Sequence, residues 1–226
     1  MIEKSATGDI RLDGIKTING SLSSDGFPSI RSLSSATLET VSGEFNIDGI
    51  QDMLSLSFTQ LKSIGGDLNL ETLSNVENIT FSNLTSVANF KLTWAAALVN
   101  LDIDKLTNIS AQDSSFTLVG AGLSSIYKLY ATVSSATFRA NDFYALQITN
   151  MTITNNLIIV SNPKLDTIFL PDNMTSTTWN TIDISQNRHL NTFGVIYHAM
   201  IRQWPWGIKT INNMTFTGNI IGTDFL

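Results

Sequence analysis

The sequence predicts an all-β fold, a right-handed parallel β-solenoid with about 22–25 residues per coil. Apolar residues recur at steps of 23 and then 22, and the segments between them alternate apolar with polar residues. Ser, Thr and Asn occupy the polar positions where charged residues would be more usual. A period between 20 and 50 residues is the signature of a repeat architecture. Thr suits strands while Ser and Asn suit turns, so the composition favours a β surface.

The period is clearest between Ile30 and Leu92, where the apolar residues align in columns. Each column predicts a stack of inward-facing side chains, one from each coil. The columns are Ile30, Met53, Val76 and Leu98; Leu33, Leu56, Ile79 and Leu101; Leu38, Leu61, Leu84 and Leu106; Val41, Ile64, Val87 and Ile109; Phe45, Leu68 and Phe90; and Ile47, Leu70 and Leu92.

Residues 45–67 illustrate one coil. FNIDG and MLSLSF each alternate as a half-buried strand does, and LKSIGG closes the coil. We expect the pair Gly65–Gly66 to turn the chain at φ values that other residues dislike. A leucine-rich repeat with a helix in each unit is the rival interpretation, but LSLSF and ENITF lack the 3.6-residue spacing that a helix needs.

Further along the chain the register loosens after Trp94 and returns at 157–193. There a step of 25 aligns Asn162 with Asn187, which predicts a structural Asn ladder that bonds the backbone of neighbouring turns. Residues 194–210 break the pattern. We interpret Trp204-Pro205-Trp206 as a cap over an open end of the solenoid, with a sugar-stacking platform as the alternative.

The bulk composition fits one repeat domain over residues 1–226. The chain is 42% apolar and 14% charged, carries a net charge of −6 and contains no cysteine. No basic stripe is visible, so we expect no nucleic-acid partner. Disulfides, thiolate zinc sites and cysteine nucleophiles are excluded. The first residues lack the apolar region of a signal peptide, and both termini fit a chain cut from a longer protein.

A search for catalytic groups finds little. The two histidines are His189, in the polar stretch QNRHL, and His198. Asp102 and Asp104 would point to one face of a strand, as the paired carboxylates of a β-helix polysaccharide hydrolase do. Because they flank the apolar Ile103, we expect both to be solvated and unsuited to acid–base work. We therefore expect no enzyme activity, no catalytic residues, no metal site and no cofactor.

Candidate N-glycosylation sites are more numerous. The triplet N-x-S/T occurs seven times, against roughly five expected by chance from the Asn, Ser and Thr content. Since Asn78, Asn83 and Asn108 themselves lie outside the apolar columns, glycans are sterically possible there in a secreted protein. The candidate acceptors are Asn19, Asn78, Asn83, Asn108, Asn150, Asn173 and Asn213.

The run GDIRLDGIKTINGSL, followed by LSSATLETVSGEFNI, resembles fungal GPI-anchored cell-wall proteins of the sporulation-specific and cell-wall-organisation family. TIDISQNRHL and INNMTF are similar to that family's later repeats, so the resemblance extends from Gly8 to about Phe216. It implies leucine-rich repeats like those of receptor L-domains. It also implies a signal-directed, secreted glycoprotein at the cell wall or outer face of the plasma membrane, with a GPI anchor on the full-length parent.

The chain departs from this family in lacking a signal peptide, a Ser/Thr-rich stalk and the cysteines that members commonly carry near SLSSDGF. The function implied is a non-enzymatic wall protein that supports wall organisation and contacts polysaccharide or a surface protein. A β-helix carbohydrate-active enzyme and a bacterial surface repeat adhesin are the alternatives.

Overall fold

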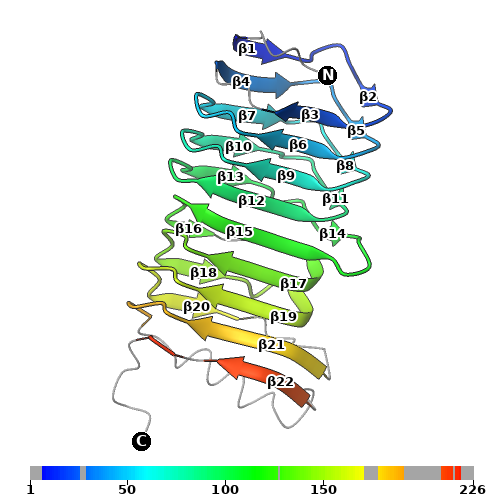
Figure 1. The fold of residues 1–226 in the computed structure, drawn as a ribbon. Helices are drawn as coiled ribbons and strands as arrows, with labels where there is room; N and C mark the ends of the chain where they lie inside the picture. The colour runs from blue at the N-terminus through cyan, green and yellow to red at the C-terminus, as the bar shows by residue number, and fades with distance from the viewer. Residues whose placement is uncertain are drawn as a thin grey trace, which may run out of the picture.

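A computed structural model describes residues 7–25, 29–126, 128–170, 178–190, 210–215 and 217–219. It confirms the all-β parallel β-solenoid, with about 23 residues per coil (Figure 1). Within these ranges every strand pairing is parallel and no helix occurs. The rival interpretation with a helix in each repeat is therefore wrong for the described coils.

The strands form three columns, of which two merge in the second half of the solenoid. The first face contains β1 (Gly8–Arg11), β4 (Ile30–Ser35), β7 (Ser55–Phe58), β10 (Asn78–Thr80) and β13 (Asn100–Asp102), then β16 (Ser125–Ile126), β18 (Ala145–Gln147) and β20 (Thr167–Phe169). The short strands are β2 (Thr17–Ile18), β5 (Thr40–Val41), β8 (Ser63–Ile64), β11 (Ser86–Val87) and β14 (Asn108–Ile109). The long face contains β3 (Leu22–Asp25), β6 (Phe45–Asp48), β9 (Leu68–Glu71), β12 (Phe90–Ala95), β15 (Ser115–Ala121), β17 (Thr132–Arg139), β19 (Thr152–Val160), β21 (Thr178–Ser185) and β22 (Thr210–Thr215).

The short and long columns merge in the second half of the solenoid. In β17, Thr132 pairs with Asn108 of the short strand β14, while Ser135 pairs with Ser115 of the long strand β15. One strand thus replaces two. The step between paired core residues changes from 26, between Phe90 and Phe116, to 20, between Phe116 and Ala136, and the sequence register after Trp94 is irregular as a result.

The predicted apolar columns form the core. All of their members are buried except Leu101, which is partly buried. Aromatic rings fill the centre: Phe45 meets Phe58 edge to face with centroids 4.9 Å apart, and Phe90 stacks on Phe116 at 4.7 Å. Each fully buried large side chain contributes roughly 1.5–3 kcal/mol, so the stack of coils holds together mainly through this interior.

The glycine pair Gly65–Gly66 is required for a different reason from the one predicted. Neither residue has a positive φ. A Cβ on Gly65 would instead lie 2.2 Å from the carbonyl oxygen of Ser42, and one on Gly66 would lie 2.9 Å from the backbone nitrogen of Glu44. Close stacking of consecutive coils at this corner excludes a side chain, so the expectation of unusual φ values was wrong.

The predicted Asn ladder is confirmed, and it is longer than predicted. Asn141, Asn162 and Asn187 are fully buried, and Asn219 continues the stack. Each side-chain amide donates to a carbonyl of the preceding coil, as Asn187 Nδ2 does to Ile159 O at 2.8 Å. The side-chain oxygens of Asn162, Asn187 and Asn219 each accept the backbone N–H of the preceding ladder residue at 2.9–3.0 Å, and that of Asn141 accepts the N–H of Ala121 at 3.0 Å. The ladder therefore satisfies corner groups that no strand pairing reaches.

A left-handed residue precedes every rung of the ladder. Ala140, Ser161, Gln186 and Gly218 have φ values of 53°, 58°, 57° and 71°. This conformation turns the chain sharply enough for the next side chain to enter the interior. It costs an L-residue about 1–2 kcal/mol, which the buried hydrogen bonds of the ladder offset.

Candidate functional site

A lattice of polar side chains covers the outer side of the first face. Residues of β4, β7, β10 and β13 alternate between the core and solvent, so the side chains next to the buried Leu33, Leu56 and Ile79 point outward. Strand pairing aligns them coil by coil, at about 4.8 Å per step. We call this surface the polar face; it consists of Ser32, Ser34, Ser55, Ser57, Asn78, Thr80, Asn100 and Asp102.

Most side chains of the polar face have no hydrogen-bond partner among the described residues. Ser32 Oγ donates to Asp9 Oδ1 at 2.7 Å, and Asp102 Oδ2 accepts from Ser82 Oγ at 2.6 Å. Among the described residues, the other six side chains of the polar face make no hydrogen bond to protein. Their hydroxyl and amide groups are therefore available to solvent or to a ligand.

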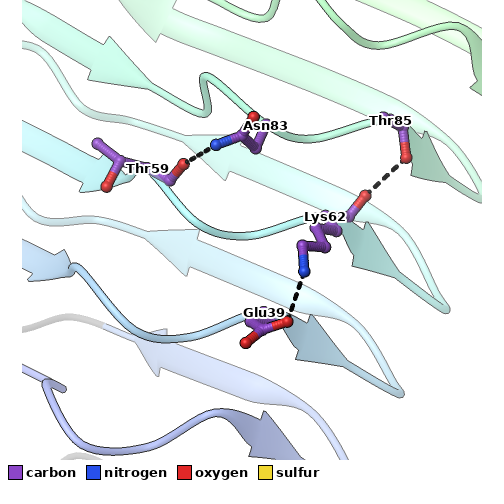
Figure 2. Close-up of polar contacts among 5 residues, drawn as sticks. All are labelled: Glu39, Thr59, Lys62, Asn83 and Thr85. Atoms are coloured by element: carbon purple, nitrogen blue, oxygen red, sulfur yellow. Dashed lines mark hydrogen bonds and ion pairs between the residues drawn. The ribbon is translucent and has the colours of Figure 1, made fainter.

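The corner beside the polar face is held by contacts between adjacent coils, shown in Figure 2. Lys62 Nζ lies 2.6 Å from Glu39 Oε2, Asn83 Nδ2 donates to Thr59 O at 2.7 Å, and Thr85 Oγ1 donates to Lys62 O at 3.0 Å. These contacts fix the corner, so the polar face next to it is preorganised.

The short strands carry a second outward column of the same chemistry. Thr40 pairs with Ser63, Ser63 with Ser86, and Ser86 with Asn108. We call Thr17, Thr40, Ser63 and Ser86 the hydroxyl column; the amide of Asn108 continues it by one coil. It is narrower than the polar face, because each short strand offers a single outward side chain.

Four surface ion pairs also link adjacent coils: Glu39–Lys62, Glu71–Lys91, Asp104–Lys128 and Asp142–Lys164. The hydrogen bond from Lys62, and then its charge, lower the pKa of Glu39. Contacts with Asp104 and Asp142 likewise raise the pKa values of Lys128 and Lys164. Because all these groups are solvent-exposed, the pairs align coils more than they stabilise them.

The aspartate pair expected on one strand face is not a pair in the structure. β13 ends at Asp102, and Asp104 lies in the following turn beyond the buried Ile103. Asp102 accepts from Ser82, whereas Asp104 binds Lys128 at 2.9 Å. The expectation that the two carboxylates share a strand face was therefore wrong, because the strand is too short to include both.

Among the other predicted positions, His189 is exposed, as expected of a solvated corner residue, while His198 and Trp204-Pro205-Trp206 lie outside the described residues. The part of the chain that the structure describes contains no group of three or more His, Cys, Asp or Glu residues that could hold a metal ion.

The candidate glycosylation sites differ in accessibility. Asn83 is only half-exposed, and its amide nitrogen, the atom that would carry a glycan, already donates to Thr59 O. Asn173 lies outside the described residues. The five exposed acceptors are Asn19, Asn78, Asn108, Asn150 and Asn213.

Fold and surface together define the class: a parallel β-solenoid repeat protein with a hydroxyl- and amide-rich outer face. A scan against protein-family models, a search of curated proteins and a search of solved structures each find no match. No helix long and apolar enough to cross a membrane is found among the described residues.

Proposed function

We propose that the chain is a non-enzymatic structural protein of the cell surface or cell wall, which presents its polar face to a polysaccharide or to a surface protein. The resemblance of GDIRLDGIKTINGSL and later segments to fungal wall-organisation proteins supports this role. In this proposal the mature protein is extracellular and N-glycosylated, and the full-length parent carries a GPI anchor.

The observation that carries the proposal is the unbonded polar face. Ser34, Ser57 and Thr80 repeat the same donor and acceptor at one-coil spacing. A polymer with a repeating unit can contact such a lattice at several successive coils, and many weak contacts add up to avidity. Protein–protein interfaces are centred on aromatic and apolar residues. The polar face has none, so polysaccharide is the ligand that it favours.

The surroundings of the acidic residues support a non-enzymatic role. Glycoside hydrolysis needs two carboxylates at a defined separation, one of them with a raised pKa. Asp102 and Asp104 are bound to separate partners, Ser82 and Lys128. We expect no release of reducing ends from β-glucan, chitin, mannan or pectin. Turnover that is lost in Asp102→Asn or Asp104→Asn would refute this and favour the carbohydrate-active enzyme.

Binding is tested by co-sedimentation of the purified protein with the same polymers in insoluble form. The double variant Ser55→Val, Ser57→Val removes two hydroxyls from the polar face but keeps β-compatible side chains. We expect at least one polymer to sediment the wild type and this variant to bind about fivefold less, a loss near 1 kcal/mol.

The matched control is Thr40→Val, Ser63→Val, which removes two hydroxyls from the hydroxyl column instead. It should bind like the wild type, and circular dichroism should show both variants folded. Absence of sedimentation with every polymer, or equal losses in the two double variants, would contradict the proposed surface.

A further inference from the structure

The first face is interrupted between β13 and β16. The five-stranded sheet ends at β13, and a separate three-stranded sheet begins at β16. No hydrogen bond joins the N–H of Ser124 to the carbonyl of Val99, although its equivalent forms in the neighbouring coils. The equivalent backbone hydrogen bonds, each written as N–H donor and carbonyl acceptor, are Leu54 to Arg31 (2.8 Å), Glu77 to Leu54 (2.9 Å), Val99 to Glu77 (2.9 Å), Tyr144 to Ser124 (2.8 Å) and Asp166 to Tyr144 (3.0 Å).

The interruption coincides with a shorter connection in the chain. In four successive coils the first face reaches the short strand in eight residues, for example from Asn100 to Asn108. In the next coil only seven residues lead from Ser125 to Thr132, which pairs with Asn108. With one residue fewer, β16 cannot follow the path of β13 while Thr132 keeps its pairing.

The opening is local, because the two coils remain in contact on both sides of it. The N–H of Gly122 donates to Ala95 O at 3.0 Å before the break, and Thr132 pairs with Asn108 after it. Between these points lies a groove of about 310 Å³, open to solvent. This volume is at the lower end of the range of small-molecule sites, roughly 300–1,000 Å³.

The base of the groove is apolar. Leu123 and Ile126 are buried and Leu101 is partly buried, and all three line the groove. Val99 stands at its edge with 75% of its surface exposed. Such a base packs against the C–H groups of a ligand and gives it no charge preference.

The rim of the groove is polar but electrically balanced. The side chains of Asn100 and Ser125 line it without a hydrogen bond to described protein groups. Asp104 and Lys128, also in the lining, neutralise each other at 2.9 Å. Among the described residues the carbonyl of Val99 has no hydrogen-bond partner, so it adds an acceptor to the rim. The N–H of Ser124, between the lining residues Leu123 and Ser125, also has no partner in the described part of the chain and adds a donor. A ligand that fits must be neutral, partly apolar, and able both to donate and to accept.

We propose that this groove binds one or two neutral sugar rings. A pyranose has an apolar C–H face for the base and hydroxyls that both donate and accept at the rim. An extended peptide would need the coils to separate to about twice the 4.8 Å strand spacing, which the contacts at Ala95 and Thr132 prevent. The assignment rests on the proposed function: Asn100 belongs to the polar face, so the groove would hold a unit of a polymer lying there.

The test uses laminaribiose, chitobiose and mannobiose as probes and follows backbone amides of the intact chain by nuclear magnetic resonance. We expect at least one disaccharide, at up to about 10 mM, to shift the amides of Ser124 and Ser125 saturably, since a site this small suggests a millimolar Kd. Asn100→Trp fills the groove and should weaken this binding by about tenfold or more. Asn180→Trp, at an exposed position of β21 outside the polar face and the groove, should leave it within about twofold.

Four outcomes would overturn the proposal: no shift at Ser124 and Ser125 with any disaccharide, undiminished shifts in Asn100→Trp, equal losses in both tryptophan variants, or shifts caused only by an extended Thr-Val-Thr-Val peptide. Failure here is distinguishable from failure of the proposed function. Sedimentation with a polymer but no disaccharide shift would refute the groove alone. Disaccharide shifts without sedimentation would refute the polar face and support the groove.

Discussion

Replacing Asn162 with alanine removes a central rung of the Asn ladder. Asn162 is fully buried, and its Nδ2 donates to Phe138 O and to Asn187 Oδ1, each at 3.0 Å. Its Oδ1 accepts the backbone N–H of Asn141 at 3.0 Å. Asn162→Ala leaves the carbonyl of Phe138 and the N–H of Asn141 without these partners in the interior.

The expected loss of stability follows from those two groups. A buried donor or acceptor left unsatisfied costs about 1–3 kcal/mol, so the variant should lose about 2–6 kcal/mol. That is a large fraction of the roughly 5–15 kcal/mol that stabilises a domain. Because coils in a solenoid contact only their neighbours, the loss should be concentrated in the coils around the ladder.

Urea unfolding, followed by circular dichroism and by hydrogen exchange of the Asn141 amide, measures both the size and the place of the loss. The control is Asn180→Ala: Asn180 is exposed and donates to Asn156 Oδ1 at 3.0 Å, a bond that water can replace. It should change the free energy of unfolding by no more than about 0.5 kcal/mol. A loss below about 1 kcal/mol in Asn162→Ala, with the Asn141 amide still protected, would refute the account of the ladder.

Three further predictions concern the core, the glycans and the ion pairs. Leu84→Asp should prevent folding, because Leu84 is fully buried and the change removes roughly 2 kcal/mol of apolar burial and buries an unpaired carboxylate. In a eukaryotic secretory host, glycopeptide mapping by mass spectrometry should find glycan on the exposed Asn150 more often than on Asn83, whose amide already donates to Thr59 O. The Glu39–Lys62 pair should add a small stabilisation, because the pKa of Glu39 is lower in the folded than in the unfolded protein. This stabilisation is present above the unfolded pKa and is lost as pH falls through the folded pKa. Urea unfolding between about pH 5 and 3 measures it.

Each has a control. Thr85→Asp places the same charge on an exposed neighbour of Leu84 and should fold normally; a cooperative melt of Leu84→Asp near that of the wild type would contradict the column assignment. Glycan on Asn83 at the level of Asn150, or on neither, would contradict the accessibility argument. In Glu39→Gln the part of the pH dependence that comes from this ion pair should disappear. A pH profile of stability identical to that of the wild type would exclude the pair as a contributor.

The coil architecture was predictable because its determinant is periodic in the sequence. Leu38, Leu61 and Leu84 must face inward once per coil, so the step between them defines the coil length and the register of the neighbouring strands. The match of Asn162 with Asn187 was visible for the same reason. Asn141 and Asn219 were missed because their steps to these residues, 21 and 32, depart from the period.

Other features were decided only in three dimensions, because they depend on which groups meet across coils. Gly65 is required by the nearness of Ser42 O, a contact that its own φ does not reveal. The partner of Asn83 is a backbone carbonyl one coil away, and no local pattern marks it. The coils separate at Val99 because the connection from Ser125 to Thr132 is one residue shorter than in the earlier coils. Thr132 nevertheless keeps its pairing with Asn108. Periodicity thus determined how the chain coils, and the stacking of successive coils decided which polar groups remain free to bind.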